Sequence, residues 1–193
     1  MSDTKATTGA SIWKNIFSGR SVQKGSTEEL LTKVPAFSML SARELKEVAA
    51  IVHKREYRSG EPVFYQGDPG LGMYIIQEGS VSITIPGKGG EQQELVALSE
   101  GDFFGELALL DESPRSANAV CKDDCSLIGF FRPDLFDLIE KKSGLGIKIV
   151  LQLAEIVAMR LRNTDKEVTK LRNMIEKLEA DLEKLNPAEK KGE

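Results

Sequence analysis

Hydrophobic residues change their spacing at about residue 56, and no other feature of the sequence limits the fold as strongly. From 56 to 131 they occur in short segments rich in Val, Ile, Tyr and Phe, and the segment SVSITIPG (80–87) alternates apolar with polar residues. Such alternation is typical of a strand with one buried face. Glycines separate the segments, as at Gly60, Gly67, Gly79 and Gly101. The pattern predicts an α+β, mainly β fold: an antiparallel β-roll or jelly-roll-like barrel.

Helices are predicted on both sides of this β region. Two capping boxes, Ser26 with Glu29 and Ser41 with Glu44, indicate helix starts before it. After it, Pro133 at a first helical position opens a helix that Ser143-Gly144 is expected to interrupt. The predicted organisation is a flexible N-terminal segment, a β-roll domain, a long helix and a disordered tail, at residues 1–25, 26–143, 144–186 and 187–193.

The long helix carries a heptad repeat. Apolar residues follow the a and d positions of a coiled coil from Ile147 to Leu185, with Thr164 as a polar d residue. In a parallel dimer Arg160 would face Asp165 of the second copy, and a further pair of opposite charges follows one heptad later. We therefore expect a parallel homodimer through this coiled coil. The alternative is that the stripe packs only on the chain's own roll.

Residues 101–120, GDFFGELALLDESPRSANAV, have the chemistry of an anion site. Gly105 permits a close backbone approach, and a short helix is expected from Glu106 to Leu110, whose first N–H groups suit a phosphate. Arg115 offers paired donors to phosphate oxygens. Because a carboxylate repels phosphate, Glu106 is expected to accept hydrogen bonds from an uncharged group such as a sugar hydroxyl. Together these features suggest a nucleotide.

This stretch resembles the phosphate-binding cassette of the cyclic-nucleotide-binding domain family. The resemblance implies that Arg115 pairs with a cyclic phosphate. It implies too that the N–H groups of Ala108 and Ser116 donate to the phosphate oxygens, and that Glu106 and the backbone at Gly105 bind the ribose 2′-hydroxyl. The matching positions are Phe104, Gly105, Glu106, Leu107, Ala108, Leu109, Pro114, Arg115, Ser116 and Ala117. The lead-in LLTKVPAFSMLSARELKEVA and the run YQGDPGLGMYIIQEGSVSI extend the likeness.

The long helix resembles the dimer helix of bacterial catabolite activators, the Crp/Fnr-like sensors. In that resemblance Thr164 falls where the family's Thr contacts the adenine amino group, and Ser116 matches a Ser beside the arginine. Both favour cAMP as the ligand. cGMP stays open, because the motif Arg115-Ser116-Ala117-Asn118 is close to the R-T-A-N of cGMP-responsive members. Only eight residues follow Leu185, so the winged helix-turn-helix, and direct DNA binding, are not expected.

Composition excludes several other classes. A net charge of −4 argues against broad nucleic-acid binding. One histidine, His53, and two cysteines, Cys121 and Cys125, suggest no metal site, disulfide framework or catalytic constellation, so neither an enzyme nor a cofactor is expected. No apolar run approaches a membrane span and no secretory signal is seen, which makes the cytoplasm the expected compartment.

The N-terminal segment has an amphipathic pattern of its own. Ile12, Trp13, Ile16 and Phe17 would share one face of a short helix. Three interpretations stay open: docking on this protein or its dimer mate, docking on a partner protein, and a membrane-surface anchor, the last disfavoured by few cations. The sequence as a whole predicts a cyclic-nucleotide sensor that signals to an unknown effector protein. The alternative is a degenerate dimerisation module that binds no nucleotide.

Overall fold

The computed structural model describes residues 26–87 and 89–185, with side chains to residue 182. The predictions for residues 1–25 and 187–193 therefore lie outside the described residues. The chain divides into two compact units between Ile156 and Val157, and the long helix α6 contributes to both. No helix in the described ranges is both long enough and apolar enough to cross a bilayer.

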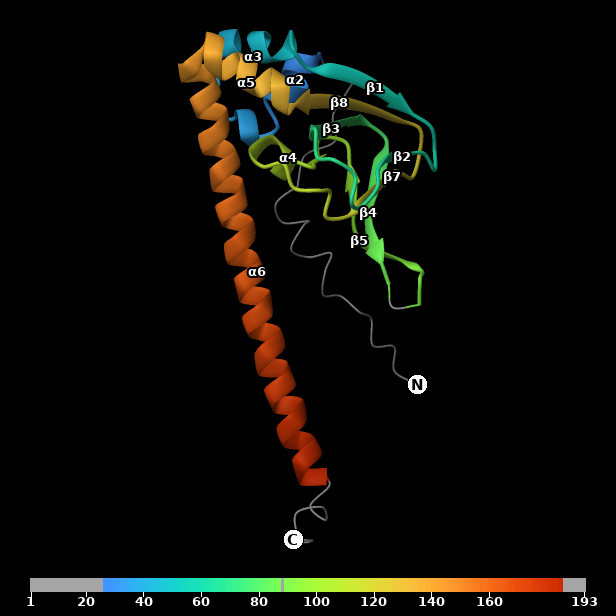
Figure 1. Ribbon diagram of the computed structural model, residues 1–193. Helices are drawn as coiled ribbons and strands as arrows, with labels where there is room; N and C mark the ends of the chain where they lie inside the picture. The colour runs from blue at the N-terminus through green and yellow to red at the C-terminus, as the bar shows by residue number, and fades with distance from the viewer. Residues whose placement is uncertain (1–25, 88, 186–193) are drawn as a thin grey trace. The chain divides into compact units, whose positions relative to one another are not determined.

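The β region forms two antiparallel sheets of four strands each, with orders β1-β8-β3-β6 and β2-β7-β4-β5 (Figure 1). This confirms the predicted mainly β roll, as a pair of sheets rather than a closed barrel. In β4 the apolar residues Val81 and Ile83 belong to the hydrophobic core, as predicted. The prediction of a single buried face is wrong, because Ser82 and Thr84 are also buried and bond polar side chains of the neighbouring strand. The strands are β1 (His53–Tyr57), β2 (Pro62–Phe64), β3 (Gly72–Glu78), β4 (Ser80–Pro86), β5 (Gln92–Ser99), β6 (Phe103–Phe104), β7 (Asn118–Cys121) and β8 (Cys125–Phe131).

Short helices cover one end of the sheets (Figure 1). These are α2 (Thr27–Leu31), the 3-10 turn η1 (Pro35–Phe37), α3 (Ala42–Ala49), α4 (Leu107–Leu110) and α5 (Arg132–Lys141). Both predicted capping boxes are present, with Ser26 and Ser41 accepting from the N–H groups of Glu29 and Glu44. Phe37 of η1 packs edge-on against Phe130 of β8, with ring centroids 5.9 Å apart. This contact joins the lead-in helices to the core of the roll.

Helix α6 spans Ser143–Leu185. The interruption between α5 and α6 is Lys142 alone, with φ −144° and ψ 66°, whereas Ser143 and Gly144 are already helical. The first part of α6 belongs to the roll unit because it has its own buried face, made of Leu145, Ile149, Leu153 and Ile156. The residues of this second apolar face do not occupy the a and d positions of the heptad repeat, so the repeat did not predict it.

Candidate functional site

The segment from β6 to α4 turns sharply at Gly105. This residue has φ +75°, and a Cβ there would lie 2.6 Å from Nη1 of Arg115 and 3.2 Å from the carbonyl oxygen of Gly72. Only glycine suits both the backbone angle and the space. The helix α4 then starts directly after Glu106, as the sequence predicts, and ends at Leu110. The turn brings the Gly105 carbonyl against the arginine.

Arg115 is buried, with 7% of its surface exposed. Nη1 donates to the Gly105 carbonyl at 3.2 Å and Nη2 donates to the Gly72 carbonyl at 2.8 Å. Its guanidinium carbon lies 4.1 Å from the ring centroid of Phe64, a cation–π contact. Burial lowers the pKa of Arg115, and the nearby Tyr74, Glu106 and Asp68 oppose that shift. The group stays cationic, since arginine does not deprotonate in proteins.

One donor of this guanidinium remains available. The Nε atom of Arg115 is buried, and no hydrogen-bond partner for it occurs in the part of the chain that the structure describes. A buried donor without a partner costs roughly 1–3 kcal/mol, more when charged, and such groups call for an explanation. A buried guanidinium with an unused donor is the chemistry of a binding site for an anion with paired oxygens.

The main chain of Arg115 is fixed to a loop that the sequence analysis did not assign to the site. Its N–H donates to the Asp68 carbonyl at 2.9 Å, and its carbonyl accepts from the Gly67 N–H at 2.9 Å. The Asp68 carboxylate in turn accepts from the Tyr65 N–H at 2.7 Å. Only the glycine-rich run GDPGLG hinted at this role, because tight turns near a ligand favour glycine.

The other predicted cassette residues divide into buried and exposed groups. Glu106 is 1% exposed and Ala117 is a core residue, whereas Leu107 and Ser116 are exposed. The Ala108 N–H, predicted to donate to phosphate, donates to the Gly105 carbonyl at 3.2 Å. The structure therefore gathers Gly105, Glu106, Ala108 and Arg115 in one place, with two of the predicted donors used internally.

Asn118, the last residue of the motif that is close to R-T-A-N, has a structural role. Its carbonyl oxygen accepts from the Gln66 N–H at 2.8 Å, and its amide nitrogen donates to Thr84 at 3.3 Å and to Gln92 at 2.9 Å. The side chain is buried in this network. Its hydrogen-bonding groups are occupied by the roll itself, which leaves Ser116 as the exposed polar residue of the motif.

Thr164 lies in the second compact unit, on α6. It is exposed, and its hydroxyl donates to the Arg160 carbonyl at 3.0 Å, the usual back-bond of a helical threonine. Large apolar residues of the heptad stripe in this unit are 41–64% exposed in the single chain: Leu161, Val168, Leu171, Ile175, Leu178 and Leu182.

A concave region lies on the roll away from the cassette residues. It has a volume of ≈ 460 Å³ and its lining includes Glu56, Glu61, Glu78 and Asp124 with one cation, Arg58. Its negative charge is unsuited to an anion. Within the described residues, no group of His, Cys, Asp and Glu has the arrangement of a metal site.

Comparisons with known proteins agree with the chemistry of the cassette. Residues 54–142 match the model of the cyclic nucleotide-binding domain. The chain is 37% identical over 134 residues to the cyclic AMP receptor protein of Thermus thermophilus, an alignment covering 69% of this chain and 60% of that protein. It is 43% identical over 104 residues to the cAMP-dependent protein kinase regulatory subunit of Mycosarcoma maydis, covering 52% of this chain and 19% of the subunit.

The fold agrees as well. The crystal structure of the Thermus thermophilus catabolite activator protein matches with a TM-score of 0.65 and 36% identity, covering 72% of this chain and 63% of that chain. The regulatory domain of Toxoplasma gondii PKA, crystallised with cAMP, matches with a TM-score of 0.55 and 26% identity, covering 63% and 46%. This chain thus spans less than two thirds of each of these relatives.

Proposed function

Because residues 54–142 form a cyclic nucleotide-binding domain, we propose that this protein is a cAMP-binding sensor that signals through its long helix. The observation that carries the proposal is Arg115, a buried guanidinium with an unused Nε donor beside the Gly105 turn. In a roll with a purely structural role, a buried cation with an unsatisfied donor would only cost stability. This argues against the alternative of a degenerate module that binds no nucleotide.

In the proposed binding mode the cyclic phosphate meets the guanidinium of Arg115 and the N–H groups of Ala108 and Ser116. Glu106 and the backbone at Gly105 bind the ribose 2′-hydroxyl. The Ala108 N–H must change its partner, because it donates to the Gly105 carbonyl, which also accepts from Nη1 of Arg115. Binding therefore requires a local rearrangement of the cassette, and that rearrangement is a means of passing a signal to the helices around it.

cAMP is proposed as the preferred nucleotide, with cGMP as the alternative. Ser116 is exposed beside Arg115, and Thr164 on α6 is exposed as well. Both match residues near the base in the resemblance to catabolite activators. The names of the relatives point the same way, since a cyclic AMP receptor protein and a cAMP-dependent kinase subunit are among them. The same Ser116 keeps cGMP open, since a hydroxyl beside the arginine can also serve guanine in this family.

A parallel homodimer through α6 is the proposed output element. Its seam residues from Leu161 to Leu182 are 41–64% exposed in one chain, which is unfavourable unless a second apolar stripe covers them. The ligand shifts the dimer if it binds one helix arrangement better than another. An unidentified effector protein would then read the change in α6.

Calorimetric titration with cAMP and cGMP tests the ligand assignment. We expect wild type to bind cAMP more tightly than cGMP, and Arg115→Ala to lose roughly 2–5 kcal/mol of binding, thirtyfold or more. Arg55→Ala, an exposed arginine of β1, is the matched control and should bind as wild type does. Thermal melts must show that each variant is folded. Failure of wild type to bind either nucleotide would leave the degenerate module as the better reading.

Light scattering tests the dimer separately. Leu171→Glu places a charge in the seam at a d position and should lower the molar mass towards that of a monomer. Lys170→Glu, its neighbour on the outer face of the predicted coiled coil, is the control and should stay dimeric. If wild type is a monomer at micromolar concentration, the proposed dimer is wrong, while the proposed nucleotide site is unaffected.

A further inference from the structure

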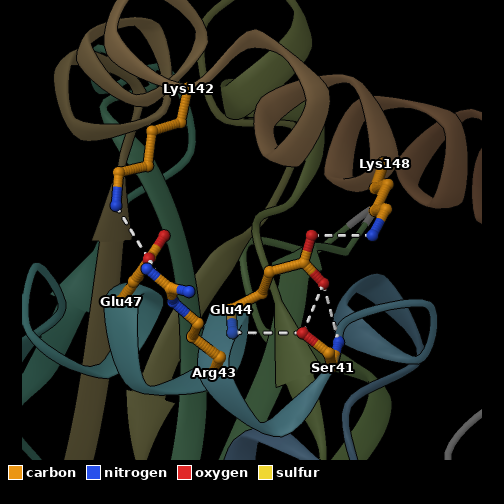
Figure 2. A network of polar contacts seen from close by, with 6 residues as sticks. All are labelled: Ser41, Arg43, Glu44, Glu47, Lys142 and Lys148. Carbon is orange, nitrogen blue, oxygen red and sulfur yellow. Dashed lines mark hydrogen bonds and ion pairs between the residues drawn. The ribbon is translucent and has the colours of Figure 1, made fainter.

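The corner between α5 and α6 is held by two ion pairs to α3 (Figure 2). Nζ of Lys142, the residue between the two helices, lies 2.7 Å from Oε1 of Glu47. Nζ of Lys148, in the second turn of α6, lies 2.7 Å from Oε1 of Glu44. Glu44 and Glu47 are three residues apart, so they share one face of α3. We name these four residues the α3 clamp.

Glu44 is the more strongly fixed of the two carboxylates. While Oε1 pairs with Lys148, Oε2 accepts from the Ser41 N–H and hydroxyl, both at 2.8 Å. The bond from Lys148, followed by the bonds from Ser41, lowers the pKa of Glu44 to about 2. The capping box thus aims this carboxylate at α6, as Figure 2 shows. A third contact follows further along the helix, where the Ser38 hydroxyl donates to Gln152 at 2.7 Å.

Helix α5 joins this clamp to the cassette. At the start of α5, the Arg132 N–H donates to the Leu71 carbonyl at 2.9 Å, and its guanidinium lies 3.5 Å from Glu112 in the cassette turn. At its other end, Lys142 follows directly and pairs with Glu47. The same ten-residue helix therefore touches the cassette at one end and ends at the clamp. A change in the cassette turn has a continuous path of contacts to the base of α6.

We propose that the α3 clamp opposes nucleotide binding by holding the base of α6 in the arrangement in which Arg115 and the Ala108 N–H are bonded to carbonyl groups. The inference rests on the proposed function. The cassette indicates that the ion pairs weaken binding rather than strengthen it. In the arrangement that contains both ion pairs, Arg115 and the Ala108 N–H are bonded to carbonyl groups. A ligand that takes these donors must disturb that arrangement. Contacts that exist only in that arrangement stabilise it, and they therefore weaken the ligand's affinity.

The α3 clamp is one of several contacts that keep the base of α6 in place. Ile149 and Leu153 of α6 are fully buried against the roll, and this apolar contact keeps the helix base in place when the ion pairs are removed. The pairs are partly exposed, with 21–50% of each side chain accessible, so their effect is modest. Glu44, Glu47, Lys142 and Lys148 are positioning residues, since they act on the site through α5.

The test combines nucleotide affinity with hydrogen–deuterium exchange in the full chain. Glu44→Gln removes the charge but retains the capping geometry, because glutamine also serves in a capping box. The double variant Glu44→Gln/Glu47→Gln removes both pairs. The control is Lys141→Gln, which breaks an exposed pair with Asp137 inside α5, 2.8 Å across. Exchange is measured without nucleotide, and affinity by calorimetry with cAMP.

We expect faster amide exchange over residues 145–156 and three- to tenfold tighter cAMP binding in the double variant, with Lys141→Gln unchanged in both. In wild type, cAMP should accelerate exchange over the same residues, because the coupling is reciprocal. Unchanged exchange in the double variant overturns the clamp. If exchange is faster but cAMP affinity is unchanged or weaker, the clamp does not oppose nucleotide binding. If wild type binds no cyclic nucleotide, the proposed function fails and the regulatory role with it, while the exchange data still show whether the ion pairs hold α6.

Discussion

Replacing Gly105 with alanine should damage the cassette through two separable effects. The first is backbone strain, since Gly105 has φ +75° and a left-handed conformation costs an alanine about 1–2 kcal/mol. The second is contact, because the new Cβ would lie 2.6 Å from Nη1 of Arg115. A relaxed contact needs about 3.5 Å, so the guanidinium must withdraw by almost 1 Å. The hydrogen bond from Nη1 to the Gly105 carbonyl, 3.2 Å long, is then lost.

The contact effect has an expected magnitude of its own. A hydrogen bond from a charged group contributes about 1.5–3 kcal/mol, so Gly105→Ala should lose about 2.5–5 kcal/mol of folding free energy in total. Gly60→Ala is the matched control. Gly60 has φ +79° and nothing lies within 4 Å of its built Cβ, so this variant carries the backbone strain without the contact. It should lose only about 1–2 kcal/mol.

Urea denaturation followed by circular dichroism, at one protein concentration, measures the two free energies. Calorimetry with cAMP adds the second readout: displacement of the guanidinium should weaken binding roughly ten- to a hundredfold, while Gly60→Ala binds as wild type does. Equal losses of stability in the two variants, together with unchanged cAMP affinity in Gly105→Ala, would refute the assigned contact between Gly105 and Arg115.

Three further outcomes are expected. Thr164→Val should weaken cAMP binding in calorimetry and raise the melting temperature of the dimer, because a polar d residue is removed; unchanged affinity would detach Thr164 from the base. Burial raises the pKa of Cys121 to about 12 and both cysteines are buried, so a thiol reagent at pH 8 should modify Cys121 and Cys125 only after denaturation; rapid native labelling would contradict this. The folded pKa of Glu44 is about 2 against an ordinary 4.5, so its stabilisation is complete above pH 4.5 and is lost as the pH falls towards 2. Unfolding midpoints of Glu44→Gln should fall less steeply than those of wild type over that range, and parallel curves would contradict the assignment.

The fold was predictable from the sequence where its signals are local. Capping boxes at Ser26 and Ser41 lie within one helical turn, and the alternation in β4 lies within seven residues. The pairing of the strands into two sheets is long-range, and a periodic pattern carries no information about partners. The second buried face of α6, with Ile149 and Leu153, was missed for a related reason. The first part of α6 contains both the heptad stripe and the buried face. The heptad repeat continues along the whole helix, so it dominates the sequence pattern and the shorter buried face is not recognised.

The sequence predicted the residues that are proposed to contact the ligand, but not the residues that hold them in position. Gly105, Glu106 and Arg115 lie in one stretch with recognisable chemistry. The Gly72 carbonyl and the Phe64 ring also position the guanidinium, but they precede it by dozens of residues and a carbonyl has no signature in sequence. The α3 clamp was hidden in the same way, since Glu44 and Lys148 are 104 residues apart.

The two carbonyl groups on Arg115 link the recognition of phosphate to that of sugar. A phosphate that draws Nη1 and Nη2 away from these carbonyls gains charge-assisted bonds, but the Gly72 carbonyl loses its Arg115 donor and the Gly105 carbonyl keeps only the Ala108 N–H. A buried carbonyl left without a donor costs about 1–3 kcal/mol. In the proposed mode a ribose 2′-hydroxyl lies at the Gly105 backbone and can donate to its carbonyl. In the proposed mode a nucleotide therefore brings a second polar group, fixed beside its phosphate, to the carbonyl that the phosphate disturbs, and we expect this site to bind a cyclic nucleotide more tightly than an anion without a sugar.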